Sequence, residues 1–221
     1  MFIVKASSIL LFLTFALILI NICGKRYHLN FEIQRKLLHI VLGLVSLSFP
    51  FVFETTFEVA LLLLSAFFIQ LSIRYIPLLR RTLGESIYGV NRSWVGAGLF
   101  LISILALFIY SNGDYALYAG PLLLVTFADA FAAIFGTQYG KKHYLILGNH
   151  KSVEGTIAFF VTAFFVLFFL LIFTSSHTLL LNIFISVVVA IFGAVAEFFS
   201  GRDLDNLTVP AVTFLVLQYL L

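Results

Sequence analysis

Acidic residues stand out at two places in this strongly apolar chain, and the first is Asp129. Small residues follow it at +3, +4, +7 and +11, namely Ala132, Ala133, Gly136 and Gly140. A carboxylate within an apolar helix costs several kcal/mol unless it meets protein, water or a cation. A stripe of small residues on the same helical face lets a second helix or a ligand approach closely. The pattern favours a functional acid; the alternative is an acid near a helix end that reaches the water interface.

The second acidic group lies between residues 197 and 206. Glu197 ends an apolar run, and Asp203, Asp205 and Asn206 follow in a short turn. Carboxylates and an amide are hard oxygen ligands that suit Mg²⁺, which is usually held by one or two carboxylates together with substrate phosphates. For Asp203 above all, the alternative is a solvated turn with a local side-chain hydrogen bond.

Basic residues with glycines form the longest polar stretch between the later apolar runs, GKKHYLILGNHKSVEG at residues 140–155. Lys141, Lys142 and Lys151 supply positive charge, and Gly155 allows close backbone approach. Ser152 is expected to cap the following helix, whose free N–H groups would favour a phosphate. The stretch lacks the spacing of a Walker A loop. The alternative is an ordinary loop whose lysines only orient the chain.

A further basic group, RKLLH at residues 35–39, stands at the start of an apolar run. Arg35 and His39 are four residues apart and would share a helical face. The group predicts contact with a phosphate or head group, against the alternative of a structural histidine with orienting charges. Residues 91–93 (Asn-Arg-Ser) enter a later run similarly, with a weaker signal.

The elements that must position these residues are membrane helices. Of the 221 residues, 62% are hydrophobic and 10% are charged, and mean hydropathy is +1.13, whereas a soluble domain has about 25% charged residues. A helix crosses the hydrocarbon with about 20 apolar residues. Eight runs qualify: 6–23, 37–53, 57–76, 94–110, 114–136, 155–174, 178–199 and 207–221. We predict an all-α integral membrane protein with about eight transmembrane helices in one polytopic domain, residues 1–221, whose first run is an uncleaved helix.

Basic residues predict the orientation of this domain. Twelve of the 13 Lys and Arg residues fall in alternate connections, and only Lys5 lies on the other side. By the positive-inside rule, the basic side is cytoplasmic and both termini lie outside. The excess of basic residues therefore serves orientation, and no nucleic-acid partner is expected. All the polar clusters fall on the cytoplasmic side or just beneath it, which predicts a metal–phosphate site at that boundary.

Four motifs in this order resemble the phytol kinase and dolichol kinase family, which is related to the phosphatidate cytidylyltransferases. The central pair is DxxAxxxGxxxGK at residues 129–141 with KSxEG at residues 151–155. RKxxH at residues 35–39 and Glu197 followed by DNLTVP at residues 205–210 resemble the lipid-alcohol kinase branch in particular. The resemblance covers about residues 35–210, nearly the whole chain after the first span.

The resemblance implies a kinase that transfers the terminal phosphate of CTP, or of another NTP, to a membrane alcohol such as phytol, a polyprenol (dolichol) or diacylglycerol. We predict that Mg²⁺ is held, directly or through water, by Asp129, Glu197 and Asp205. The residues predicted to bind nucleotide or substrate are Arg35, Lys36, His39, Lys141, Lys151, Ser152, Gly155 and Asn206. Glu154 or Asp205 would orient or deprotonate the lipid hydroxyl, and spacing alone does not divide these roles further.

Two rival functions share some of these features. A CDP-lipid-forming cytidylyltransferase would use much the same site, but members of that family end in His-Gly-Gly and Asp-Arg-x-Asp elements. Here SGRD at residues 200–203 and DN at 205–206 stand instead, which favours a kinase. An ion-coupled transporter would also carry intramembrane acids. Transporters often show internal repeats, and this chain has no convincing one.

Overall fold

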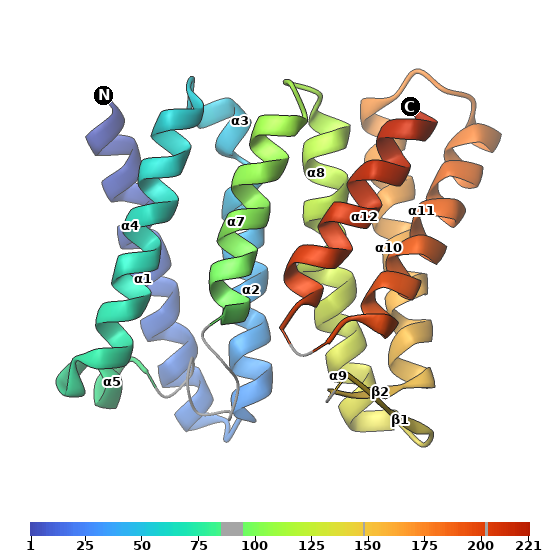
Figure 1. Ribbon diagram of the computed structural model, residues 1–221. Helices are drawn as coiled ribbons and strands as arrows, with labels where there is room; N and C mark the ends of the chain where they lie inside the picture. The colour runs from blue at the N-terminus through green and yellow to red at the C-terminus, as the bar shows by residue number, and fades with distance from the viewer. Residues whose placement is uncertain (85–94, 148, 202) are drawn as a thin grey trace. The chain divides into compact units, whose positions relative to one another are not determined.

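The computed structural model describes residues 1–84, 95–147, 149–201 and 203–221 (Figure 1). The predicted entry to the fourth span at residues 91–93, and Arg202, lie outside the described residues. The chain is almost entirely helical, with one two-stranded antiparallel sheet. The all-α prediction is therefore confirmed except for this hairpin. The chain forms two compact units, Met1–Ser93 and Trp94–Leu221.

The regular elements in the described residues of the first unit are all helices. They are α1 (Phe2–Arg26), α2 (Phe31–Ser46), α3 (Phe49–Val52), α4 (Thr56–Tyr75) and α5 (Pro77–Thr82). Polar side chains fix two of the starts, because Asn30 accepts a hydrogen bond from the Glu32 N–H and Thr55 accepts one from the Glu58 N–H. Such caps satisfy backbone donors that have no partner within the helix. α1 packs against α2 and α4.

The second unit carries most of the predicted site. Its elements are α7 (Val95–Tyr110), α8 (Tyr115–Leu123), the π-helix η1 (Leu124–Ala128), α9 (Asp129–Tyr139), β1 (His143–Ile146), β2 (Asn149–Ser152), α10 (Val153–Thr174), α11 (Leu179–Phe199) and α12 (Asp205–Leu220). α10 packs against α9 and α11, and α12 packs against α11, α7 and α8 (Figure 1).

Among the described residues, six helical segments are long and apolar enough to cross a membrane. They are Phe2–Arg26, Phe31–Val52, Thr56–Tyr75, Tyr115–Tyr139, Val153–Thr174 and Leu179–Phe199. The other two predicted spans correspond to α7 and α12, which have 16 residues each. These helices support a multi-pass membrane protein, while the count of eight spans and the outside placement of both termini stay predictions.

α10 shows how the sequence separates core from lipid. Every fourth residue faces the interior of the unit and is buried: Gly155, Phe159, Ala163, Leu167 and Leu171. The phenylalanines between them, such as Phe165 and Phe169, are half exposed. Apolar side chains on the outer face suit hydrocarbon as the solvent.

The small residues after Asp129 bring α9 and α10 into close contact. A Cβ atom on Gly155 would lie 2.9 Å from the Ala132 carbonyl oxygen and 3.3 Å from the Gly136 Cα. The helices can therefore approach this closely only because residue 155 has no side chain. The predicted close approach of a second helix along this stripe is confirmed.

Candidate active site

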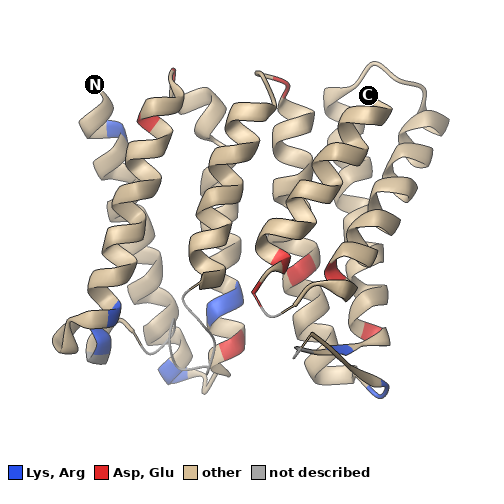
Figure 2. Cartoon of the chain, viewed as in Figure 1, with Lys and Arg blue, Asp and Glu red and all other residues tan. Residues whose placement is uncertain are grey.

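A buried ion-pair cluster lies at one end of the second unit, centred on Lys151. The Lys151 Nζ donates a hydrogen bond to Glu197 Oε1 and lies 3.7 Å from Asp205 Oδ2. All three residues are buried, with 8%, 4% and 4% of their surface exposed. Figure 2 shows acidic residues of α9, α11 and α12 gathered near this end, with basic residues of the hairpin beyond them.

Asp129 belongs to the same cluster. It is 3% exposed, and its charge acts on both Lys151 and Glu197. Burial opposes the charged form of Lys151, but Glu197, Asp205 and Asp129 together outweigh it and raise the pKa of the lysine. Lys151 is therefore an ammonium ion at neutral pH.

A π-helix sets the position of Asp129. η1 ends at Ala128, directly before this residue, and Pro121 already interrupts the hydrogen-bond ladder one turn earlier because proline has no N–H. A π-turn contains an extra residue and so rotates the side chains that follow, and such turns are frequent at functional sites. Thr126, within η1, has a buried hydroxyl that finds no hydrogen-bond partner in the described part of the chain.

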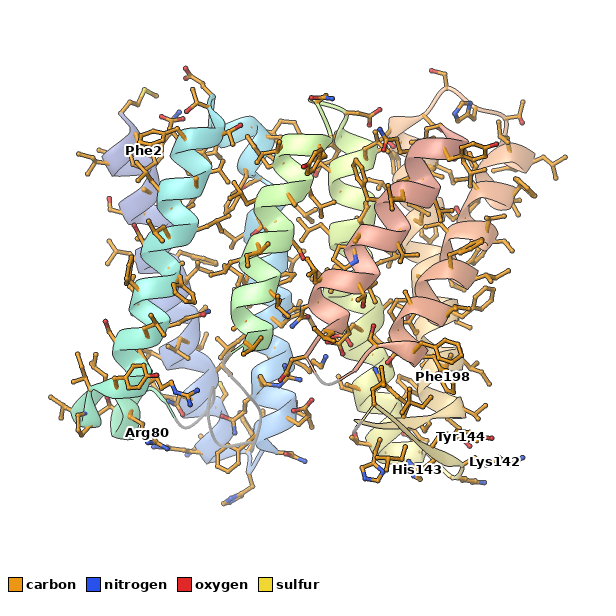
Figure 3. All side chains as sticks on the ribbon, viewed as in Figure 1. Phe2, Arg80, Lys142, His143, Tyr144 and Phe198 are labelled. Carbon is orange, nitrogen blue, oxygen red and sulfur yellow. The ribbon has the colours of Figure 1, made fainter. Side chains whose placement is uncertain are left out.

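The β-hairpin positions Lys151. β2 pairs with β1 in a register that places Lys151 opposite Tyr144. The Tyr144 ring lies 6.1 Å from the ring of Phe198, the residue after Glu197, and Figure 3 shows these two side chains together. The hairpin therefore rests against the end of α11 that carries the acid. Lys141 and Lys142 are exposed at its outer side, and the predicted contact of Lys141 with phosphate stays a prediction.

Ser152 caps α10 as predicted. Its hydroxyl accepts a hydrogen bond of 3.1 Å from the Gly155 N–H. The same hydroxyl would be 2.8 Å from a Cβ atom on Gly136, so the start of α10 is closely covered by α9. The proposed contact of Ser152 and Gly155 with nucleotide is a prediction that this packing does not test.

Asn206 joins α12 to α7, a helix that the sequence reasoning did not assign to the site. The side-chain amide of Asn206 donates a hydrogen bond to the Gly96 carbonyl (2.9 Å). The backbone carbonyl of Asn206 accepts one from the Ser103 hydroxyl (2.7 Å). Asp203, with φ of 68°, also lies against Gly96. Gly96 and Ser103 are seven residues apart and so share one face of α7, but this spacing does not indicate that α12 is the partner of that face.

In the part of the chain that the structure describes, Lys151 forms ion pairs with Glu197 and Asp205 and not with Glu154. It lies in the first turn of α10, where a carboxylate interacts favourably with the helix dipole. Its buried Oε2 atom has no hydrogen-bond partner among the described residues. The roles of Glu154 and Asp205 toward the lipid hydroxyl both stay predictions.

The basic group at residues 35–39 lies on α2, in the first unit. Arg35 donates hydrogen bonds of 3.1 and 2.6 Å to Glu32, one turn earlier on the same helix. Lys36 is 3% exposed. Contact of Arg35, Lys36 and His39 with substrate therefore stays a prediction.

The oxygen atoms of the cluster suit a divalent cation in part. Within the described residues, no three His, Cys, Asp or Glu side chains form a group that could hold a metal ion. However, Glu197 Oε2 is buried without a partner, and Mg²⁺ is usually held by only one or two carboxylates together with phosphates. The donors fit such a shared site, while the ligand set Asp129, Glu197 and Asp205 stays a prediction.

Comparison with known proteins supports the family suggested by the motifs. Phytol kinase from Synechocystis sp. is 31% identical to this chain over 133 residues, which cover 59% of this chain and 57% of phytol kinase. The resemblance to the phytol kinase family is confirmed. The match spans little more than half of the length of phytol kinase. The activity of phytol kinase is therefore not assigned to this chain on the basis of the match. No family model matches the chain, and no solved structure matches it.

The similarity to phytol kinase agrees with the chemistry that the site allows. Phosphoryl transfer needs cationic groups on the phosphates and a carboxylate near the attacking hydroxyl. Lys151 and Asp205 bring one group of each kind within 3.7 Å.

Proposed function

We propose that this chain is a membrane lipid-alcohol kinase that transfers the terminal phosphate of CTP, or of another NTP, to an isoprenoid alcohol such as phytol or a polyprenol, or to diacylglycerol. The observation that carries the proposal is the buried contact of Lys151 with Glu197 and Asp205 at the end of an apolar helical unit. The similarity to phytol kinase adds the substrate class.

Lys151 is suited to hold a phosphate in addition to its carboxylates. An ammonium group has three N–H donors, and one of them points at Glu197 Oε1. Its raised pKa keeps all three protons in place at neutral pH. A nucleotide phosphate could accept a hydrogen bond from a second N–H of Lys151. This bond would replace part of the hydration that the ammonium group loses on burial, and it is strong because both groups are charged.

In the proposed reaction, the hydroxyl oxygen of the alcohol attacks the terminal phosphorus. A new P–O bond forms, the bond from that phosphorus to the bridging oxygen breaks, and the nucleoside diphosphate leaves with the electron pair. We assign the hydroxyl proton to the Asp205 carboxylate, whose Oδ2 faces Lys151 at 3.7 Å. Lys151 neutralises charge on the phosphates as the diphosphate leaves.

Mg²⁺, held by Glu197 and Asp129 together with the phosphates, would supply further neutralisation of the leaving diphosphate. The unpartnered Glu197 Oε2 is the atom of this chain that supports the assignment. Glu197 also holds Lys151 in place through its other oxygen, so one side chain would set the distance between the two cationic groups.

Labelled CTP tests the proposal directly. The purified protein is incubated with phytol, Mg²⁺ and CTP labelled either at the α or at the γ phosphorus. The γ label should enter the lipid product, and the α label should remain in CDP. Asp205→Asn should lose the product, whereas Glu54→Gln, which changes an exposed acid of the first unit, should retain it. The same assay with γ-labelled ATP identifies the preferred donor.

Two results would contradict the kinase proposal. With phosphatidate as acceptor, α label in the lipid together with pyrophosphate would establish the cytidylyltransferase. Absence of label transfer to phytol, a polyprenol and diacylglycerol from either nucleotide, with correctly folded protein, would also overturn it. Ion flux into vesicles would then test the transporter.

A further inference from the structure

An apolar groove runs between α10 and α11. It is a shallow groove, open on one side, with a volume of about 360 Å³. The side chains that line it include Ile157, Phe160, Ile191, Val195, Phe198 and Phe199. Ile157, Val195 and Phe199 are 56%, 49% and 61% exposed. The groove therefore opens away from the core of the unit, toward what would be hydrocarbon in a membrane.

The groove adjoins the ion-pair cluster through the last turn of α11. Glu197 turns into the unit and bonds to Lys151, and the next two residues, Phe198 and Phe199, line the groove. On the other side, Thr156 lines the groove four residues after the Ser152 cap of α10. Both walls thus begin at the same ends of α10 and α11 as the cluster, so the polar end of a groove occupant would lie at the level of the cluster along these helices.

The length of the groove limits what it can hold. Ile191 and Phe198 are seven residues apart, which corresponds to about 10 Å along a helix. Half of a membrane's hydrocarbon is about 15 Å thick. A membrane-crossing helix would need a contact line of about 30 Å, so the groove is short for a partner helix. It matches one segment of a lipid chain.

We propose that this groove binds the part of an isoprenoid chain next to the hydroxyl group of the lipid alcohol, while the rest of the chain lies in the bilayer. The inference rests on the proposed kinase function and adds its lipid-binding surface. The occupant needs an apolar chain for the groove and a small hydroxyl head for the cluster beside it, and a lipid alcohol has both. The kinase should therefore discriminate among alcohols by structure near the hydroxyl and tolerate different chain lengths.

Two tryptophan substitutions on α10 test the groove. Ile157→Trp fills it, whereas Val161→Trp adds the same bulk one turn further along, at a position that is 44% exposed and outside the groove. Ile157→Trp should raise the KM for phytol by about tenfold or more, since one methylene group in an apolar pocket already changes specificity by 10–200-fold. The KM for the nucleotide should not change, and Val161→Trp should behave as the wild type.

A photoreactive phytol analogue with a diazirine close to the hydroxyl gives a readout that does not need catalysis. The label should map to residues 156–160 and 191–199, and unlabelled phytol should compete with it. Ile157→Trp should lose the labelling and Val161→Trp should retain it. Labels spread evenly over the exposed faces of α10 and α11, or labelling without competition, would overturn the groove. If the groove is labelled but no phosphate is transferred, the groove inference stands and the kinase proposal fails. If phosphate is transferred to phytol and Ile157→Trp and Val161→Trp behave alike in both assays, the kinase proposal stands and the groove inference fails.

Discussion

Lys151 determines whether the acids of the site can be buried together. Its ammonium group is the positive partner for Glu197 and Asp205, and it also feels the charge of Asp129. Removal of one partner from a buried ion pair leaves an uncompensated charge, which costs about 3–5 kcal/mol. Removal of both partners costs much less, because no isolated charge remains. The lysine therefore has a structural role that can be measured separately from catalysis.

Lys151→Met should lower the free energy of unfolding by about 3–5 kcal/mol, because it removes the ammonium group that Glu197 and Asp205 contact. Lys151→Met combined with Glu197→Gln should recover part of this stability, since one acid is then neutral as well. Both proteins should lack kinase activity. Unfolding in detergent measures stability, and label transfer from CTP measures activity. Equal stability of Lys151→Met and the wild type would show that the lysine does not neutralise the acids.

The raised pKa of Lys151 predicts how the stability difference between the wild type and Lys151→Met depends on pH. A raised pKa in the folded protein means that the charged lysine stabilises the fold at every pH below its unfolded pKa of about 10.4. The contribution declines only as the pH rises through the folded pKa, which is higher. The stability difference between wild type and Lys151→Met should therefore stay constant from pH 7 to about pH 10. A decline already at pH 8 would contradict it.

At the scale of elements, the sequence predicted the helices well and their polar contacts less well. Long apolar runs locate α10 and α11 almost to the residue, because only a helix satisfies its backbone in hydrocarbon. The Ser152 cap follows from a local rule and is also confirmed. The bond from Asn206 to Gly96 joins residues 110 positions apart, and no local pattern predicts it. The hairpin was missed because its strands have four residues each and rest on Phe198, a tertiary contact.

Gly155→Ala tests the crossing of α9 and α10. The new Cβ atom would lie 2.9 Å from the Ala132 carbonyl oxygen and 3.0 Å from Ser152 Oγ. The helices would have to separate, at a cost of about 1–3 kcal/mol, and Lys151 would move with the start of α10. Both thermal stability and kcat should fall. Gly201→Ala is the matched control, because its nearest contacts would be an ordinary 3.4 Å. Equal loss in the two variants would point to a general glycine effect instead of the crossing.

At the scale of the whole molecule, the positions of the basic residues predict the membrane orientation of both units. The cluster of acids with Lys151 lies in the second unit, and the basic group at residues 35–39 lies in the first. The charge pattern of the sequence predicts that both lie on the cytoplasmic side. A cytosolic nucleotide could then reach both, as the predicted nucleotide-binding role of Arg35, Lys36 and His39 requires.

Single cysteines in a Cys23→Ser background test this orientation. Tyr27 and Leu145 are exposed in connections with basic residues, one in each unit, and Glu54 and Ser176 are exposed in connections without them. An impermeant thiol reagent should label positions 27 and 145 only from the cytoplasmic side, and positions 54 and 176 only from the outside. The reason is the cost of moving Lys and Arg across a membrane, which orients short loops during insertion. If positions 27 and 145 were labelled from opposite sides, an odd number of spans would separate them. The basic group at residues 35–39 would then be unable to share a nucleotide with Lys151, whatever the activity of the protein.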